Sequence, residues 1–249
     1  MARSALHYSW AAGHAILFLS TLKYVLGLLT LKSGLIGWAY KLSYFGAIVS
    51  YGVVVFKSFG IPQANLAWVQ RAMLDEKNVQ YLILAAFFFV SKPIPLTLIP
   101  YATFSLFHIL SFLKNTVIPL IFPPPPQSNA TSTDGSTPPS SSGAGPSIQK
   151  SIGSFVKSNY ARAMKFVSYS EMIVFLRLFF GALIFNNALS MPMFYALFLR
   201  SRYVFSPYTR NAFAHVGARI DGLVAPYPQP ARIWTQAKGF LARAGGQAA

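Results

Sequence analysis

Four histidines are the residues of this chain best suited to chemistry, and their surroundings argue against catalysis. His7 and His14 would share one helix face, and His108 could join them inside a helix bundle. No carboxylate lies near them in the sequence, the zinc-hydrolase pattern HExxH is absent, and the chain has no cysteine. We therefore interpret the histidines, including His215, as packing or interfacial residues, and we expect neither a metal nor a cofactor.

Acidic residues are too few to support acid–base catalysis or a two-metal site. The chain has 5 Asp plus Glu against 21 Lys plus Arg, a formal net charge of +16. Glu171 and Arg177 are the opposite charges of one apolar segment, where both could snorkel to the membrane interface. The sequence also lacks a Gly-rich phosphate loop and a nucleophile elbow. These observations predict that the protein is not an enzyme.

The composition is typical of a membrane protein with basic aqueous faces. Of the 249 residues, 54% are hydrophobic and only 10% are charged, against about 25% charged in a soluble domain. A soluble nucleic-acid-binding protein could be as basic but would not be as apolar, so we expect no nucleic-acid partner. The predicted fold is an all-α polytopic membrane protein with two helical hairpins, a further membrane segment and amphipathic interfacial helices.

The first predicted hairpin consists of two long apolar stretches joined by a very short link. The stretches run from Ala5 to Leu31 and from Leu35 to Phe56. Each is long enough to cross a bilayer as a helix. Gly46 and Gly52 in the second stretch are small residues that would let helices approach closely.

A second hairpin is predicted from two shorter apolar stretches, Val79–Val90 and Leu96–Leu113, which would turn at Lys92–Pro95. The prolines of this turn must break or kink a helix. A single kinked, strongly tilted helix is the alternative. A further apolar stretch, Met172–Leu199, is either one span or a shallow hairpin bent near Pro192.

Changes in composition divide the chain into four parts. Four consecutive prolines open a tract without hydrophobic periodicity, which predicts a disordered linker between two membrane-associated halves. The parts are 1–118 with the membrane hairpins, 119–147 with the linker, 148–202 with an amphipathic helix and the last membrane segment, and 203–249 with a basic amphipathic tail.

The basic tail is expected to form two amphipathic helices. Ser206-Pro207 is a suitable N-cap and first-turn pair, and the run 225–230 should end the first helix. A helix with aliphatic and Trp residues opposite Lys and Arg suits the headgroup plane of a membrane; the alternative is packing on the protein's own membrane domain. The expected membrane-interface residues are Phe213, Val216, Ile220, Leu223, Ile233, Trp234 and Leu241, with Arg232, Lys238 and Arg243 as the basic residues.

The distribution of basic residues predicts the topology. The positive-inside rule places the N-terminus, 57–77, 114–165 and the tail after Leu199 in the cytosol, with Lys32 and Lys92 at lumenal turns. This arrangement requires the Met172–Leu199 stretch to enter and leave the membrane on the same side.

Two stretches, Met73–Asn115 and Met193–Val216, carry a resemblance to a known family. The first combines an acidic pair, an aromatic-rich span, a Pro break and a FSLFH core, and the second combines an aromatic run with R-x-R-Y and S-P-Y-x-R-x-x-F. Both resemble the transmembrane protein 33 family, whose fungal members are pore-membrane proteins of the endoplasmic reticulum and nuclear envelope. The matching residues are Asp75, Glu76, His108, Arg200, Arg202, Tyr203, Pro207 and Arg210.

The resemblance implies a function in shaping membranes and carries no active site. It implies a multi-pass protein of the endoplasmic reticulum membrane and nuclear envelope that shapes tubules with reticulon-type proteins and supports the assembly and distribution of nuclear pore complexes, with nucleoporins as partners. It also implies a tail whose amphipathic helices sense curved membranes and contact an import receptor.

Three functions remain open on the sequence. The first is a structural membrane protein that binds anionic, curved lipid. The second is a membrane-anchored adaptor that recruits an import receptor through its tail. The third is a small transporter centred on Arg177, Asn186 and Asn187.

Overall fold

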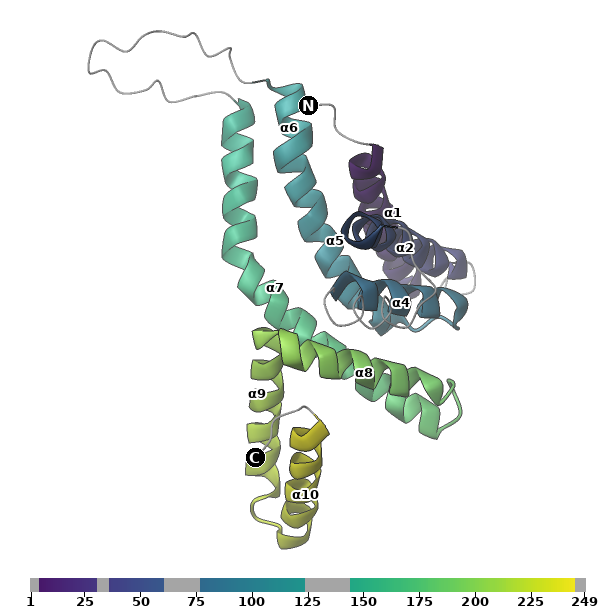
Figure 1. Ribbon diagram of the computed structural model, residues 1–249, viewed down its shortest axis with the longest axis vertical. Helices are drawn as coiled ribbons and strands as arrows, with labels where there is room; N and C mark the ends of the chain where they lie inside the picture. The colour runs from purple at the N-terminus through teal and green to yellow at the C-terminus, as the bar shows by residue number, and fades with distance from the viewer. Residues whose placement is uncertain (1–4, 31–35, 61–76, 124–143, 245–249) are drawn as a thin grey trace, which may run out of the picture.

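The computed structural model describes residues 5–30, 36–60, 77–123 and 144–244, with side chains placed as far as residue 239. Within these ranges all regular secondary structure is helical (Figure 1). The elements are α1 (Ala5–Leu29), α2 (Gly37–Phe59), α4 (Lys77–Val90), the 3₁₀ helix η2 (Pro95–Thr97), α5 (Leu98–Phe112), the π-helical η3 (Leu113–Val117), α6 (Ile118–Ile121), α7 (Ala144–Leu183), α8 (Ser190–Phe205), α9 (Pro207–Val224) and α10 (Pro228–Ala244).

Four helical segments of the described residues are long and apolar enough to cross a membrane. They are α1, α2, the run 95–121 from η2 through α6, and α7. The predicted all-α polytopic membrane fold is confirmed. The apolar helix α4 is shorter, with 14 residues.

Helices α1 and α2 pack closely because glycines lie at their contact. A Cβ added to Gly46 would lie 2.6 Å from the carbonyl oxygen of Gly13, so the two backbones nearly touch there. Ser50 adds a hydrogen bond by donating to the carbonyl oxygen of Trp10 at 3.1 Å. A Cβ added to Gly52 would have no neighbouring atom within 4 Å. Only Gly46 therefore has the close-packing role expected for both glycines.

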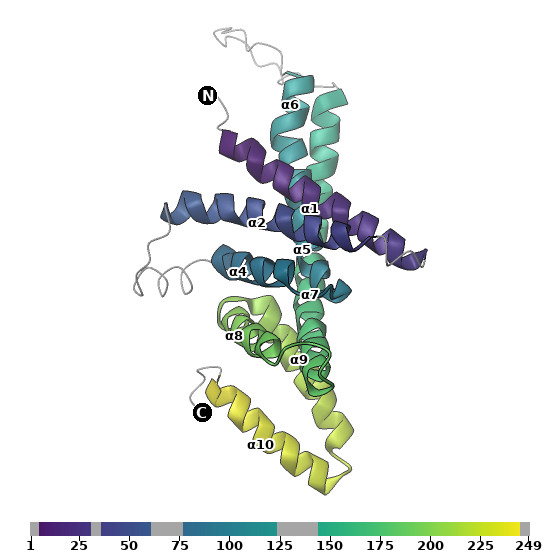
Figure 2. The same cartoon turned by 90° about the vertical axis from the view of Figure 1, so that its right-hand side faces the viewer.

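The second predicted hairpin differs in geometry from the expectation. Helix α4 ends at Val90 and the next helical element begins at Pro95, so the helix is broken where the prolines were expected to break it. However, α4 crosses α5 instead of lying antiparallel to it (Figure 2). The reason is that α4 is buried between α2 and α8: the ring of Phe88 lies 5.6 Å from that of Tyr44 and 6.4 Å from that of Tyr195.

The predicted amphipathic helix and the first part of the last membrane segment form one continuous helix, α7, of 40 residues. Its first half lies beside α5 and α6 (Figure 1). Helices also extend into both ends of the predicted linker, because α6 runs to Ile121 and α7 begins at Ala144. Pro119 and Pro146 allow this since each lies in a first helical turn, where proline is tolerated. Residues 124–143 of the predicted linker lie outside the described residues.

The last apolar stretch forms a hairpin, as one of the two alternatives predicted. Helices α7 and α8 pack side by side and are joined by residues 184–189. The bend therefore precedes Pro192, which lies in the first turn of α8. Helix α8 continues to Phe205, past residue 203 where the predicted tail begins.

Tyrosines form much of the buried core. The buried rings come from α1, α2, α4, α5 and α8, and they contact one another edge to face, tilted or stacked. Thr97 of η2 accepts a hydrogen bond from the Tyr44 hydroxyl at 2.7 Å. The hydroxyl of Tyr101 donates to the carbonyl oxygen of Tyr81 at 2.9 Å. Most of these buried phenols therefore have a hydrogen-bond partner, as an apolar core requires.

Candidate functional site

A buried ion pair joins three helices of the membrane domain. Glu171 of α7 is fully buried, and its Oε2 accepts a hydrogen bond from Arg202 Nε of α8 at 3.1 Å. The hydroxyl of Tyr81 of α4 donates to the other carboxylate oxygen. The Arg202 guanidinium also lies 5.8 Å from the centroid of the Tyr81 ring. We call these three residues the Glu171 clamp.

The geometry of the Glu171 clamp suits a structural role. Each carboxylate oxygen accepts a hydrogen bond and the side chain is fully buried, so the carboxylate is held in place and out of reach of a substrate. Arg177 is the cation nearest to Glu171 in the apolar segment, but the ion-pair partner of Glu171 is Arg202, which lies 31 residues away. A carboxylate within an apolar segment requires a partner, and this requirement was the one sequence signal that pointed to such a clamp.

The other residues that carried the family resemblance lie largely at the corner between α8 and α9. Arg210 Nη1 donates to the carbonyl oxygens of Tyr203 at 3.3 Å and Val204 at 2.7 Å, which satisfies the end of α8. Pro207 occupies the first turn of α9, and the Ser206 side chain caps it by accepting from Thr209 N at 3.3 Å. These residues fix the direction in which the tail leaves the membrane domain. Arg200 is exposed on α8, and Asp75 and Glu76 lie outside the described residues.

His7 and His14 of α1 and His108 of α5 pack between these two helices, whereas Nδ1 of His215, on α9, lies 2.7 Å from the hydroxyl oxygen of Tyr169. The rings of His14 and His108 lie 4.5 Å apart, and His14 Nδ1 is 2.9 Å from Ser105 Oγ. His7 Nε2 lies 3.2 Å from Thr116 Oγ1, so it is oriented toward η3, which follows α5. His7, His14 and His108 line a cavity of about 330 Å³. Among the described residues no three His, Cys, Asp or Glu side chains are grouped as metal ligands would be.

The tail forms a hairpin of α9 and α10 that projects from the rest of the molecule (Figure 1). Asp221 of α9 joins the two helices by accepting hydrogen bonds from Trp234 Nε1 at 2.8 Å and Lys238 Nζ at 2.6 Å. These donors, Lys238 first and Trp234 second, lower the pKa of Asp221 below its ordinary value. Helix α10 therefore packs on α9, a partner that neither alternative of the sequence analysis named.

The predicted membrane-interface residues occupy different environments. Phe213 packs against the core, and Val216 and Ile220 are half-buried on α9. Leu223 and Ile233 are 73% and 66% exposed, and Tyr227 between them in the sequence is 61% exposed. We call Leu223, Tyr227 and Ile233 the tail tip. Arg232 and Lys238 are exposed, while the side chains of Leu241 and Arg243 are outside the described residues.

Comparison with known proteins identifies the family. A family profile described as Transmembrane protein 33/Nucleoporin POM33 matches residues 1–243. The chain belongs to this family. The similarity to the transmembrane protein 33 family, seen first in two stretches of the sequence, thus extends over nearly the whole chain.

Three relatives cover most of the chain. Nucleoporin POM33 of Chaetomium thermophilum is 31% identical over 250 residues, which cover 94% of this chain and 84% of that protein. Tetra-spanning protein 1 of Schizosaccharomyces pombe is 31% identical over 96% of this chain and 84% of its own length. Pore membrane protein of 33 kDa of Saccharomyces cerevisiae is 25% identical over 89% and 76%, respectively. No solved structure matches this family member.

Proposed function

We propose that this chain is a non-enzymatic membrane protein of the endoplasmic reticulum and nuclear envelope that stabilises curved membrane and thereby supports nuclear pore complexes. The family and the names of its relatives support the link to the pore. The observation that carries the proposed mechanism is the unequal length of the membrane-domain helices.

Long and short helices are packed together in one domain. Helices α1 and α2 have 25 and 23 residues, enough to cross an apolar core about 30 Å thick. The buried neighbours α4 and α8 have 14 and 16 residues, or about 21 and 24 Å at the α-helical rise. Helices of these lengths occupy one leaflet more than the other. A domain with unequal cross-sections in the two leaflets favours curvature.

The tail hairpin adds a second contact with the membrane. The tail tip presents three exposed side chains, and Arg232, which precedes Ile233 on α10, is exposed as well. Apolar groups that insert at the headgroup boundary, together with cations that attract anionic lipid, bind curved membranes well. Each basic residue near an anionic surface contributes about 1 kcal/mol.

Reconstitution of the full chain tests both parts of the proposal. We expect the protein to convert large anionic vesicles into narrower vesicles or tubules, measured as diameters by electron cryomicroscopy. The variant L223D/I233D should weaken this effect because it places two carboxylates at the tail tip. The matched control N211D/Q236D adds one carboxylate to each tail helix at exposed polar positions and should behave as the wild type.

Two results would contradict the proposal. Unchanged vesicle diameters with wild-type protein would exclude a direct shaping activity. Equal losses in L223D/I233D and N211D/Q236D would show that added negative charge, and not the apolar tip, explains the effect. In cells, a tagged copy should follow tubules and the nuclear rim, and deletion of the gene should cluster pores or expand sheets.

The projecting tail hairpin supports a second candidate function, an adaptor for a soluble partner. Helices α9 and α10 extend beyond the membrane domain in both views (Figures 1 and 2), and α10 exposes Arg232 and Lys238. An adaptor tail would bind an import receptor in detergent, without a vesicle. The variant R232E should weaken that binding, while L223D/I233D should leave it intact; Lys238 is kept because it pairs with Asp221 within the hairpin.

A further inference from the structure

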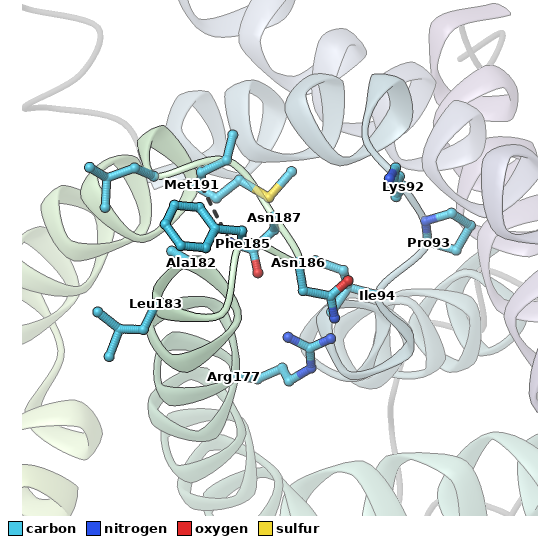
Figure 3. Close-up of a pocket in the computed structure, with 12 residues that line it drawn as sticks. Lys92, Pro93, Ile94, Arg177, Ala182, Leu183, Phe185, Asn186, Asn187 and Met191 are labelled. Carbon is cyan, nitrogen blue, oxygen red and sulfur yellow. Dashed lines mark hydrogen bonds between the residues drawn. The ribbon is translucent and has the colours of Figure 1, made fainter.

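A cavity at one end of the membrane domain brings together two segments that are far apart in the sequence. The break between α4 and α5 contributes Lys92, Pro93 and Ile94, and the turn between α7 and α8 contributes 185–189 (Figure 3). The cavity has a volume of about 630 Å³, which is within the range of small-molecule sites, about 300–1,000 Å³. Both segments therefore lie at the same end of the membrane domain.

The cavity is positively charged, and no acidic side chain that lines it neutralises this charge. Lys92 and Arg177 are its two charged lining residues, and no carboxylate lines it. Within the part of the chain that the structure describes, the ion pairs are those of Glu171 with Arg202 and of Asp221 with Lys238, so neither cavity cation takes part in one. In Figure 3 the Arg177 guanidinium points toward the Asn186 side chain, and Lys92 lies on the far side of the opening. Such an arrangement favours an anion between them.

The cavity also contains an acceptor that lacks a donor. Asn187 donates through Nδ2 to the carbonyl oxygens of Leu178 at 3.1 Å and Ala188 at 3.3 Å. Its Oδ1 is buried, and no described group donates to it. A buried acceptor without a partner is costly, so the Asn187 amide gains a hydrogen bond when it turns toward the cavity and accepts from an O–H or N–H group of a ligand.

The rim of the cavity is apolar and exposed. Phe185 is 95% exposed and Leu189 is 68% exposed, and Ile184, next to Phe185 in the turn, is 71% exposed. Phe185 also has a positive φ of 57°, which is unfavourable for a bulky residue and holds its side chain at the turn. At a membrane face such side chains contact acyl chains, which places the cavity at the depth of the headgroups.

From these features we propose that the cavity binds the headgroup of a phospholipid in which an anionic phosphodiester lies next to hydroxyl groups, as in an inositol lipid. Lys92 and Arg177 contact the phosphate, a headgroup hydroxyl donates to Asn187 Oδ1, and Phe185 and Leu189 pack on the acyl chains. The bound lipid would join the α4–α5 break to the α7–α8 turn.

Glycine at position 181 leaves room for this arrangement. A Cβ at Gly181 would lie 2.0 Å from Asn187 Oδ1 and 2.4 Å from Arg177 Nη1. The variant G181A would therefore displace both ligand-binding groups without removing either. The variant K92Q/R177Q removes the two cations directly. The control K157Q/K165Q removes two exposed cations elsewhere on α7.

Lipid binding to the detergent-solubilised full chain tests the proposal, by native mass spectrometry and by thermal shift. Phosphatidylinositol should bind saturably and raise the unfolding temperature. Phosphatidylcholine, which has a phosphate but no donor, and phosphatidylethanolamine, which has a donor but no net charge, should bind more weakly. K92Q/R177Q and G181A should weaken phosphatidylinositol binding by about tenfold or more, as expected for lost charge-assisted hydrogen bonds. K157Q/K165Q should bind as the wild type does.

Three outcomes would overturn the proposal. Equal binding of phosphatidylinositol and phosphatidylcholine would exclude recognition of the headgroup. Equal loss in K92Q/R177Q and K157Q/K165Q would show attraction by overall charge. Stabilisation by inorganic phosphate as large as that by the lipid would assign the cavity to free phosphate. The unfolding temperature of each variant without lipid shows whether it is folded.

Discussion

Replacement of Arg202 by methionine tests whether the Glu171 clamp stabilises the fold. Glu171 is 0% exposed, and R202M would leave its carboxylate buried with only the Tyr81 hydroxyl as donor. At the 3.1 Å separation of Arg202 Nε and Glu171 Oε2, and an effective dielectric constant of about 20, the attraction is about 5 kcal/mol. Removing one partner of a buried pair costs about 3–5 kcal/mol. We expect R202M to lower the free energy of unfolding by an amount in this range.

Chemical unfolding in mild detergent, followed by far-UV circular dichroism, measures this difference. Y81F removes one hydrogen bond to a charged group and keeps the ion pair, so it should cost about 1.5–3 kcal/mol. The double variant E171L/R202M removes both charges and should be more stable than R202M, since no unpaired charge remains buried. R162M, which removes an exposed cation of α7, is the control and should leave the midpoint unchanged.

Two results would refute this reasoning. If R202M unfolds at the same midpoint as the wild type, the ion pair contributes nothing to stability. If the losses in E171L and R202M simply add in the double variant, the two charges do not interact. In either case the connection of α4, α7 and α8 would depend on the tyrosine-rich core alone.

Two further predictions concern the α1–α2 contact and the tail. G46V should lower the free energy of unfolding by about 1–3 kcal/mol through overpacking, because a Cβ at this position would lie 2.6 Å from Gly13 O. G52V is the control, since a Cβ at Gly52 would have no neighbour within 4 Å. Equal unfolding midpoints of the two variants would contradict this prediction. Because Lys238 and Trp234 lower the pKa of Asp221, its contribution to the α9–α10 contact is complete above its ordinary value of 3.8 and is lost as the pH falls through the lowered value. Trp fluorescence should therefore show an acid transition that D221N lacks, and a transition unchanged in D221N would contradict this assignment.

Features that are determined by residues close together in the sequence could be predicted. Ser206 and Pro207 begin α9 as a cap and first turn because this signal lies within four residues. The break after Val90 follows from Pro93 and Pro95 in the same way. The long apolar stretches were sufficient to predict the membrane-spanning helices, since their length matches the bilayer.

Contacts between distant residues could not be predicted from the sequence. Hydrophobic periodicity shows that a helix has a buried face but not which helix covers it, so the position of α4 between α2 and α8 was missed. The pairing of Glu171 with Arg202 was missed because Arg177 was the nearer cation in the sequence. The contact of Trp234 with Asp221 was missed because an amphipathic face suits a membrane and a neighbouring helix equally well.

The continuity of α7 had a signal that was overlooked. No proline interrupts the chain between Pro146 and the turn that follows Leu183, so nothing local separated the amphipathic helix from the membrane segment. The change from a mixed to an apolar composition suggested a boundary where the backbone has none.

The contact between the end of α6 and the start of α7 bears on how this family changes in length during evolution. A Cβ added to Gly145 would lie only 2.5 Å from Phe122 Cβ, so the chain leaves and re-enters the described structure at nearly the same point. When the ends of a connection are held together, doubling its length costs only about 0.6 kcal/mol in closure entropy. Insertions, deletions or a fluorescent protein placed between these residues should therefore leave the helices undisturbed. This makes the position a permissive one for divergence between species and for labels.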